Sequence, residues 1–314
     1  MMLARVADSL YWIGRYIERA EHHSRLCDVM LTAMLDQNDA AVLVARRAIS
    51  SQRGEAEAAI DAGMSMRAAQ RLVLERANTA SVVVSLSRAR ENARQVRDQI
   101  TTETWERLNL LFLRVTAPSA ERAFVRGPAA FLQGIIADLH LFKGALDATM
   151  SHGQGWRFLL LGLYLERAQL IARLLNVCFG GEAAVGLDDH MTQMSVLRMA
   201  CGLEPYLRVY TAEMEPRRLL GFLLFDDEFP HSVRFSIKRM EEHLSNLAPP
   251  GHAVDRSHPE RLAARLSGRL EFADLDESLP TGALLAAVAQ ECSAIHEAVY
   301  ETFVSYPLEQ RLPA

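Results

Sequence analysis

Residues 11–29, YWIGRYIERAEHHSRLCDV, and residues 159–177, LLLGLYLERAQLIARLLNV, decide the fold of this chain. The two stretches align without gaps at an offset of 148 residues, the step from Gly14 to Gly162. An internal repeat indicates that the architecture is built from copies of one unit. Eight aligned positions are identical: Gly14, Tyr16, Glu18, Arg19, Ala20, Arg25, Leu26 and Val29 match Gly162, Tyr164, Glu166, Arg167, Ala168, Arg173, Leu174 and Val177.

A second pair of stretches repeats in the same order. Residues 81–91, SVVVSLSRARE, share five identities with residues 232–242, SVRFSIKRMEE, at an offset of 151 residues. Two matches in one order and at nearly one offset indicate duplication. The sequence therefore predicts an all-α, multi-helix bundle built from two pseudo-symmetric repeats, approximately 1–150 and 151–314, within one domain that spans 1–314.

Helical periodicity extends over most of the chain. Long stretches without proline or glycine repeat apolar residues three or four positions apart, and the prolines cluster between these stretches. The sequence predicts helices at 3–36, 38–50, 55–75, 80–99, 101–115, 118–126, 128–150, 153–179, 190–202, 204–214, 216–225, 230–247, 258–271 and 280–305.

Composition places the chain among ordinary globular proteins. Its 314 residues are 50% hydrophobic and 23% charged, with a net charge of −5, so no basic excess predicts binding to nucleic acid. The four cysteines, Cys27, Cys178, Cys201 and Cys292, lack paired spacing, which predicts reduced thiols and no structural zinc. No apolar run approaches the roughly 20 residues that cross a bilayer. We expect a cytoplasmic protein with no membrane association and no cofactor.

A polar stripe runs along the repeated helix. Helical spacing places Gly14, Glu18 and Arg25 on one face, and the second copy repeats this pattern. A glycine inside a helix costs about 1 kcal/mol relative to alanine, so its presence in both copies, as Gly14 and Gly162, requires a reason. The missing side chain opens a notch, in which either a second helix approaches closely or a small ligand lies beside the carboxylate.

Two interpretations of the repeated charges remain open. In the first, buried ion pairs tie the two copies together, since an unpaired buried charge is costly. In the second, the same groups form the floor of a site for an amine, a carboxylate or a phosphate. The sequence favours the first, because no catalytic motif accompanies these groups. The residues concerned are Glu18, Arg19, Arg25, Glu166, Arg167 and Arg173.

A metal site on the repeated helix is a separate possibility. Glu18 and His22 lie four residues apart, and Glu21 and His23 lie on either side of His22. Di-iron sites of the ferritin type use Glu-x-x-His on two helices, a spacing that neither copy has. The second copy carries Leu170 and Ile171 in place of the histidines. We therefore expect no metal ion here.

The stretch 88–97 is dense in arginine, and a charge run on a helix is usually a solvated face with pairs three or four residues apart. Arg88 and Glu91 recur, however, as Arg239 and Glu242. This recurrence favours equally a role in ligand binding or in locking the bundle.

Several stretches carry a resemblance to a known family. LARVADSLYWIGRYIERAEHHSRL at residues 3–26 resembles the start of the bacterial alpha-E domain family, and RARENARQVRDQITTETWERLN at 88–109 is similar to its most distinctive internal run. The chain departs from the family pattern at 77–80, where Asn-Pro is frequent, and at Met194, where tryptophan is frequent. Further matches follow in order: GLYLERAQLIARLL at 162–175, LRMACGLEPYLRVY at 197–210 and FLLFDDEFPHSVRFSIKRM at 222–240.

The resemblance implies a context without a settled activity. Alpha-E proteins are partners of circularly permuted ATP-grasp proteins, which join carboxylates to amines, and they accompany transglutaminase-like peptidases. We therefore expect a non-catalytic binding or scaffold partner that docks such a ligase or holds its peptide substrate. The chain begins at the Glu-Arg helix, so we expect no ATP-grasp part within it. Two alternatives remain: an enzyme with Glu18 or Glu166 as general base, and a purely structural subunit.

Overall fold

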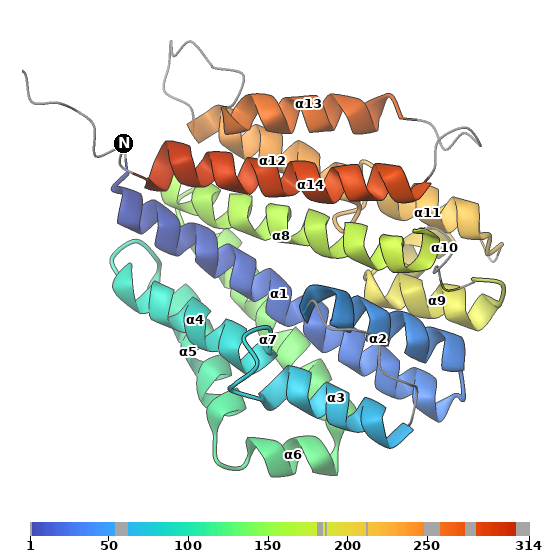
Figure 1. The fold of residues 1–314 in the computed structure, drawn as a ribbon. Coiled ribbons are helices and arrows are strands. Elements are labelled where there is room, and N and C mark those ends of the chain that lie inside the picture. The colour runs from blue at the N-terminus through green and yellow to red at the C-terminus, as the bar shows by residue number, and fades with distance from the viewer. Residues whose placement is uncertain are drawn as a thin grey trace, which may run out of the picture.

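The computed structural model describes residues 2–53, 62–180, 185, 187–211, 213–247, 258–273 and 281–305. For the described residues between 51 and 65 it describes the backbone only. Every regular element among these residues is helical (Figure 1), which confirms the all-α prediction. The helices are α1 (Ala4–Leu35), α2 (Asp39–Arg53), α3 (Ala62–Leu74), α4 (Val82–Gln95), α5 (Thr102–Thr116), α6 (Ala120–Arg126), α7 (Pro128–Thr149), α8 (Gln154–Phe179), α9 (His190–Met199), α10 (Leu203–Tyr210), α11 (Pro216–Phe225), α12 (Val233–Leu247), α13 (Pro259–Glu271) and α14 (Thr281–Val299), with a π-helical turn at Tyr300–Val304.

Most predicted helices agree with the observed ones within a few residues. The predicted start of α3 at residue 55 lies outside the described residues. The helix expected at 190–202 ends earlier, at Met199, because Cys201 takes a left-handed backbone with φ of 59° before Gly202. This turn separates α9 from α10 and sets the backbone conformation of Cys201.

The repeated helices α1 and α8 lie side by side in the middle of the bundle (Figure 1). Helices α4 and α7 pack against α1, while α12 and α14 pack against α8. Helix α8 is buried on nearly every side, as expected for a central helix whose apolar residues surround its axis. The pseudo-symmetry of the two halves, and the extent of one domain, stay predictions.

The two helical glycines lie where α1 and α8 touch. A Cβ atom on Gly14 would lie 1.9 Å from the Leu159 carbonyl oxygen, and one on Gly162 would lie 2.0 Å from the Tyr11 carbonyl oxygen. No side chain fits at either position, because real carbon–oxygen contacts exceed 3 Å. Of the two explanations for the notch, close approach of a second helix therefore accounts for both glycines.

Helix α7 is the one described helix that is long and apolar enough to cross a membrane by length and composition. Its mean hydropathy is 1.2 over the most apolar stretch. Within the bundle, α7 packs against α1 and α5. Length and composition alone are weak evidence, since core helices meet the same criteria.

Candidate functional site

The repeated glutamates and arginines form crossed ion pairs between α1 and α8. Arg167 donates from Nε to Glu18 Oε1 at 2.6 Å and from Nη2 to Oε2 at 2.9 Å. In the reciprocal pair, Arg19 Nε donates to Glu166 Oε1 at 2.6 Å. Both glutamates are buried. The glutamate of each copy therefore pairs with the arginine of the other copy: Glu18 with Arg167, and Glu166 with Arg19.

Further cations, which the sequence analysis did not select, complete this network. Arg15 Nε donates to Glu166 Oε2 at 2.6 Å. Lys143 of α7 donates from Nζ to Glu18 Oε2 at 2.7 Å and to Glu21 Oε2 at 2.5 Å. Arg15 aligns with a leucine in the second copy, and Lys143 lies in a helix with no repeated motif. Identity between the two repeated stretches marks candidate site residues in the sequence, and neither Arg15 nor Lys143 is identical between them.

The network fixes the protonation states of the repeated glutamates. Burial opposes ionisation of Glu166, but Arg15 and Arg19 outweigh it and lower its pKa to about 2. Burial likewise opposes ionisation of Glu18, and Arg167 with Lys143 hold its pKa well below the usual range. A general base at neutral pH needs a carboxylate whose pKa is raised. Neither glutamate has that property.

The aligned arginines Arg25 and Arg173 do not share one environment. Arg25 donates from Nη2 to Glu21 Oε1 at 2.9 Å, and His140 Nε2 lies 2.9 Å from the same nitrogen. Arg173 makes no hydrogen bond or ion pair among the described residues, and burial lowers its pKa. The expected pairing of these two arginines with Glu18 and Glu166 is thus replaced by a pair within α1 and by an unpaired cation on α8.

The second repeated pattern lies at the surface, apart from the buried network. Glu91 pairs with Arg94 at 2.7 Å, and Arg239 pairs with Glu242 at 2.7 Å. All four side chains are between 45% and 63% exposed. Arg88 is exposed too and places its guanidinium carbon 5.8 Å from the Tyr16 ring centroid. Glu91, Arg239 and Glu242 pair within their own helices on solvated faces of α4 and α12, whereas Arg88 of α4 contacts Tyr16 of α1.

Two arginines of the 88–97 stretch have a packing role. The guanidinium carbons of Arg90 and Arg97 lie 5.5 and 5.6 Å from the Trp105 ring centroid. Arg90 also donates from Nε to Asn109 Oδ1 at 2.7 Å. These contacts tie α4 to α5 and leave Arg88, Glu91 and Arg94 as the accessible charges.

The adjacent histidines of α1 are buried and neutral. Burial lowers the pKa of His22 to about 4 and that of His23 to about 3. His23 Nδ1 lies 2.8 Å from the Ala80 carbonyl oxygen, so it binds the chain before α4. His22 Nε2 is buried without a hydrogen-bond partner.

An open cleft lies beside the network, between the C-terminal half of α1 and the helices α9 and α10. Its volume is about 610 Å³, within the range of small-molecule sites. Charges of both signs line it: Arg25, Arg198, Asp28, Asp36 and Glu204. Thr32 and Ser195 add hydroxyl groups, and Cys201 lies on the same wall.

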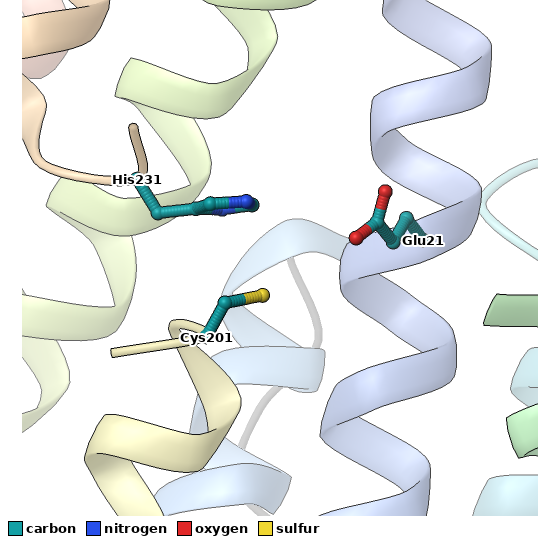
Figure 2. Close-up of side chains that lie close together, drawn as sticks. All are labelled: Glu21, Cys201 and His231. Carbon is teal, nitrogen blue, oxygen red and sulfur yellow. The ribbon is translucent and has the colours of Figure 1, made fainter. Parts of the chain in front are cut away.

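A smaller chamber adjoins the cleft, and Arg25 and Cys201 line both. Figure 2 shows Glu21, Cys201 and His231 converging on a common space from three elements. Their carboxylate, thiol and imidazole ligand atoms all lie within 4.8 Å of one another. Among the described residues, this is the one group of three acidic, thiol or imidazole side chains placed to hold a metal ion.

A rigid turn positions His231. Arg167 Nη1 donates to the Pro230 carbonyl oxygen at 2.9 Å, which links this turn to the ion-pair network. Asp226 Oδ1 accepts from the Phe229 backbone nitrogen at 2.7 Å and closes the turn from its other end. The sequence could not indicate this cluster, because residues 21, 201 and 231 meet only through tertiary packing.

Comparisons with known proteins agree with the helical fold. A family model described as a predicted alpha-helical domain with a conserved ER motif matches residues 2–304. Relatives include uncharacterized proteins of Mycobacterium bovis and of two strains of Mycobacterium tuberculosis, each 23% identical over 318 residues. The alignments cover 93% of this chain and 35% of each relative, so the chain spans about a third of their length. No solved structure matches the chain.

Proposed function

Because this chain belongs to the Alpha-E family, we propose that it is a non-catalytic binding module of a peptide-forming or peptide-modifying system. The partner that we propose is a circularly permuted ATP-grasp protein, a ligase that joins a carboxylate to an amine. The relatives support a modular role, since the matched region is 35% of their length and the family's helical unit is therefore one part of larger proteins.

The mixed charge of the cleft is the observation that carries the proposal. Arg25 and Arg198 offer donors for a carboxylate, while Asp28, Asp36 and Glu204 offer acceptors for an amine. A peptide with free ends carries both groups. Charged hydrogen bonds give such a site its specificity, since each contributes roughly 1.5–3 kcal/mol.

The alternatives account for less of the geometry. An enzyme with Glu18 or Glu166 as base would need a raised pKa, whereas neighbouring cations lower both. A purely structural subunit would use the ion pairs between α1 and α8 but leaves the charged cleft without a role. A binding module uses the network to hold α1 against α8 and the cleft as its site.

Calorimetric titration with alanyl-alanine and its end-capped forms tests the ligand class. We expect the free dipeptide to bind, and N-acetylation or C-amidation each to weaken binding about tenfold or more, since each removes a charged partner. Arg198→Ala should weaken binding of the free form, while Arg208→Ala, an exposed arginine of α10 outside the cleft, should not. Equal binding of free and capped peptides, or none at millimolar concentration, would refute the ligand class.

Co-purification tests the docking part separately. The accessible charges Arg88, Glu91 and Arg94 of α4 make the proposed contact surface. We expect a complex with the ATP-grasp partner at micromolar concentration that Arg88→Glu with Arg94→Glu weakens. The exposed Arg218 of α11, which pairs with Glu213 and does not belong to the proposed contact surface on α4, provides the control. Arg218→Glu should leave the complex unchanged. Absence of any complex with the unaltered chain would contradict docking.

A further inference from the structure

We propose that Glu21, Cys201 and His231 form a binding site for a zinc-class divalent metal ion. The three side chains come from α1, from the turn after α9 and from the turn before α12, and they face one another (Figure 2). The proposal does not rest on the peptide ligand proposed above. It departs from the expectation of no metal, which was drawn from Glu18, Glu21, His22 and His23 on the repeated helix.

The donor set selects the class of ion. Thiolate and imidazole favour zinc and similar transition metals, whereas calcium and magnesium take oxygen ligands. Zinc bonds of about 2.0–2.3 Å place tetrahedral ligand atoms roughly 3.5 Å apart. The ligand atoms lie within 4.8 Å of one another, so they must move closer to reach that spacing. A thiolate and a carboxylate supply two negative charges to the divalent ion. Arg25 and Arg167 also line the chamber and pair there with Glu21 and Glu18.

The chamber has room for one ion. It offers about 10 Å³ to the centre of a water-sized sphere, close to what a single water requires. Leu170, Ile171 and Met199 form apolar walls, which strengthen polar interactions by excluding water. His22 lines the same chamber, and its buried Nε2 has no hydrogen-bond partner. An unsatisfied buried nitrogen on a lining residue is a second sign that a polar or ionic guest belongs there.

The cations that hold Glu21 have other partners. Lys143 Nζ also contacts Glu18 Oε2 at 2.7 Å, so it keeps a carboxylate when Glu21 turns to the ion. Arg25 Nη2 also lies 2.9 Å from His140 Nε2. Release of Glu21 therefore leaves neither Lys143 nor Arg25 without a polar neighbour.

Cys201 is the left-handed residue of the turn that ends α9, in which the Gly202 backbone nitrogen donates to the Leu197 carbonyl oxygen at 2.7 Å. Its φ of 59° lies in the left-handed region, which follows many helices but is usually occupied by glycine. A side chain with a Cβ costs roughly 1–2 kcal/mol there. Strained residues of this kind cluster at functional sites. The thiol is thus held at an unfavourable position that points it into the chamber.

The three protein ligands leave a fourth position. Cys201 and Arg25 line both the chamber and the cleft, so this position is reached from the cleft. Zinc sites with three protein ligands and one open position bind water or a ligand there. A carboxylate entering the cleft would meet the ion at this point.

Cobalt and zinc titration of the chelator-treated full chain tests the proposal. We expect one ion per chain, an absorption band from cobalt–thiolate bonding, and a rise in melting temperature with zinc. Cys201→Gly should abolish the cobalt–thiolate band and weaken zinc binding by at least about 100-fold, since loss of even an outer partner costs 10–100-fold. This variant should remain folded, because glycine suits the left-handed position.

Two further variants complete the test. His231→Gln should weaken zinc binding to a similar degree, while Cys178→Ser, a buried cysteine of α8 outside the chamber, should leave both the band and the affinity unchanged. Equal affinity in the unaltered chain and Cys201→Gly would mean binding at surface histidines and would overturn the proposal. Failure of the folded, unaltered chain to bind either ion would overturn it as well.

Discussion

Glu18 and Arg167 lie 149 residues apart in the sequence and form two hydrogen bonds, of 2.6 and 2.9 Å, in the interior of the bundle. Glu166 and Arg19 form the reciprocal contact. Both pairs lie one turn beyond the glycines at which α1 and α8 touch. The glycines bring the helices together, and the ion pairs satisfy the charges that this contact buries.

Neutralising either repeated glutamate should destabilise the protein strongly. Glu18→Gln leaves Arg167 without its carboxylate and removes one of the two carboxylates that Lys143 contacts. Loss of one partner of a buried pair costs about 3–5 kcal/mol. Glu166→Gln should cost a similar amount, because Arg15 and Arg19 lose theirs. Urea denaturation measures the free energy of unfolding. Glu91→Gln, which breaks an exposed pair, is the control and should leave the free energy of unfolding nearly unchanged, because solvent screens the pair.

Adding a methyl group at the helix contact should separate α1 from α8. Gly14→Ala and Gly162→Ala each place a Cβ within about 2 Å of a backbone oxygen, and such overpacking should cost about 3 kcal/mol or more. Gly144→Ala in α7 is the matched control, since nothing lies within 4 Å of its Cβ position. That change should stabilise by roughly 0.5–1 kcal/mol, as alanine favours a helix. Thermal melts that rank the three variants otherwise would contradict the assigned contact.

The unpaired arginine of α8 should be dispensable for folding. Arg173 is partly buried and has no hydrogen bond or ion pair among the described residues, so replacing it by methionine removes a desolvation cost. We expect Arg173→Met to be neutral or stabilising by up to about 1 kcal/mol. Arg167→Met should instead be strongly destabilising. Calorimetric melting of both variants tests the contrast, and a comparable loss in the two would show that Arg173 has a structural partner.

Stability should fall on mild acidification because of buried neutral histidines. The pKa values of His22 and His23 fall from 6.5 to about 4 and about 3 on burial. Below pH 6.5 the unfolded chain binds protons that the folded chain excludes, so stability is complete above 6.5 and declines as the pH drops towards these values. Each histidine contributes a slope of about 1 kcal/mol per pH unit. The ion-paired glutamates add to the loss only below their ordinary pKa of 4.5.

Urea denaturation between neutral pH and about pH 5 measures this slope. His23→Gln should reduce it by the contribution of one histidine, because glutamine binds no proton. An unchanged slope in His23→Gln would mean that His23 is protonated in the folded protein.

Much of the fold was predictable from local pattern. Apolar spacing and proline positions indicated the helices. The glycine shared by the two Glu-Arg stretches indicated either a close helix contact or a ligand notch, and the structure shows the helix contact. The prediction that repeated acids and bases meet inside the bundle agrees with the crossed pairs of Glu18 with Arg167 and Glu166 with Arg19. Repetition was informative here because both copies contribute to one interface.

Sequence failed where a site depends on residues that are not repeated. Lys143 has no counterpart that the repeat could mark, and Cys201 and His231 occupy turns between helices. Their meeting with Glu21 follows from how α9 and α12 pack around α1 and α8. The Arg88–Glu91 pattern carries a different kind of information. It repeats because both helices present the same solvated face, so identity between the copies indicated a shared environment and not a shared contact.

A double-mutant cycle on Glu18 and Arg167 tests the central claim, that crossed ion pairs hold α1 against α8. Unfolding free energies of Glu18→Gln, Arg167→Met and the double variant give the coupling between the two side chains. We predict a coupling of about 2–3 kcal/mol, at the upper end for residues in contact. The exposed pair Glu91–Arg94 should give a much smaller coupling, because solvent screens it. A coupling for Glu18 and Arg167 no larger than that of the exposed pair would contradict the claim.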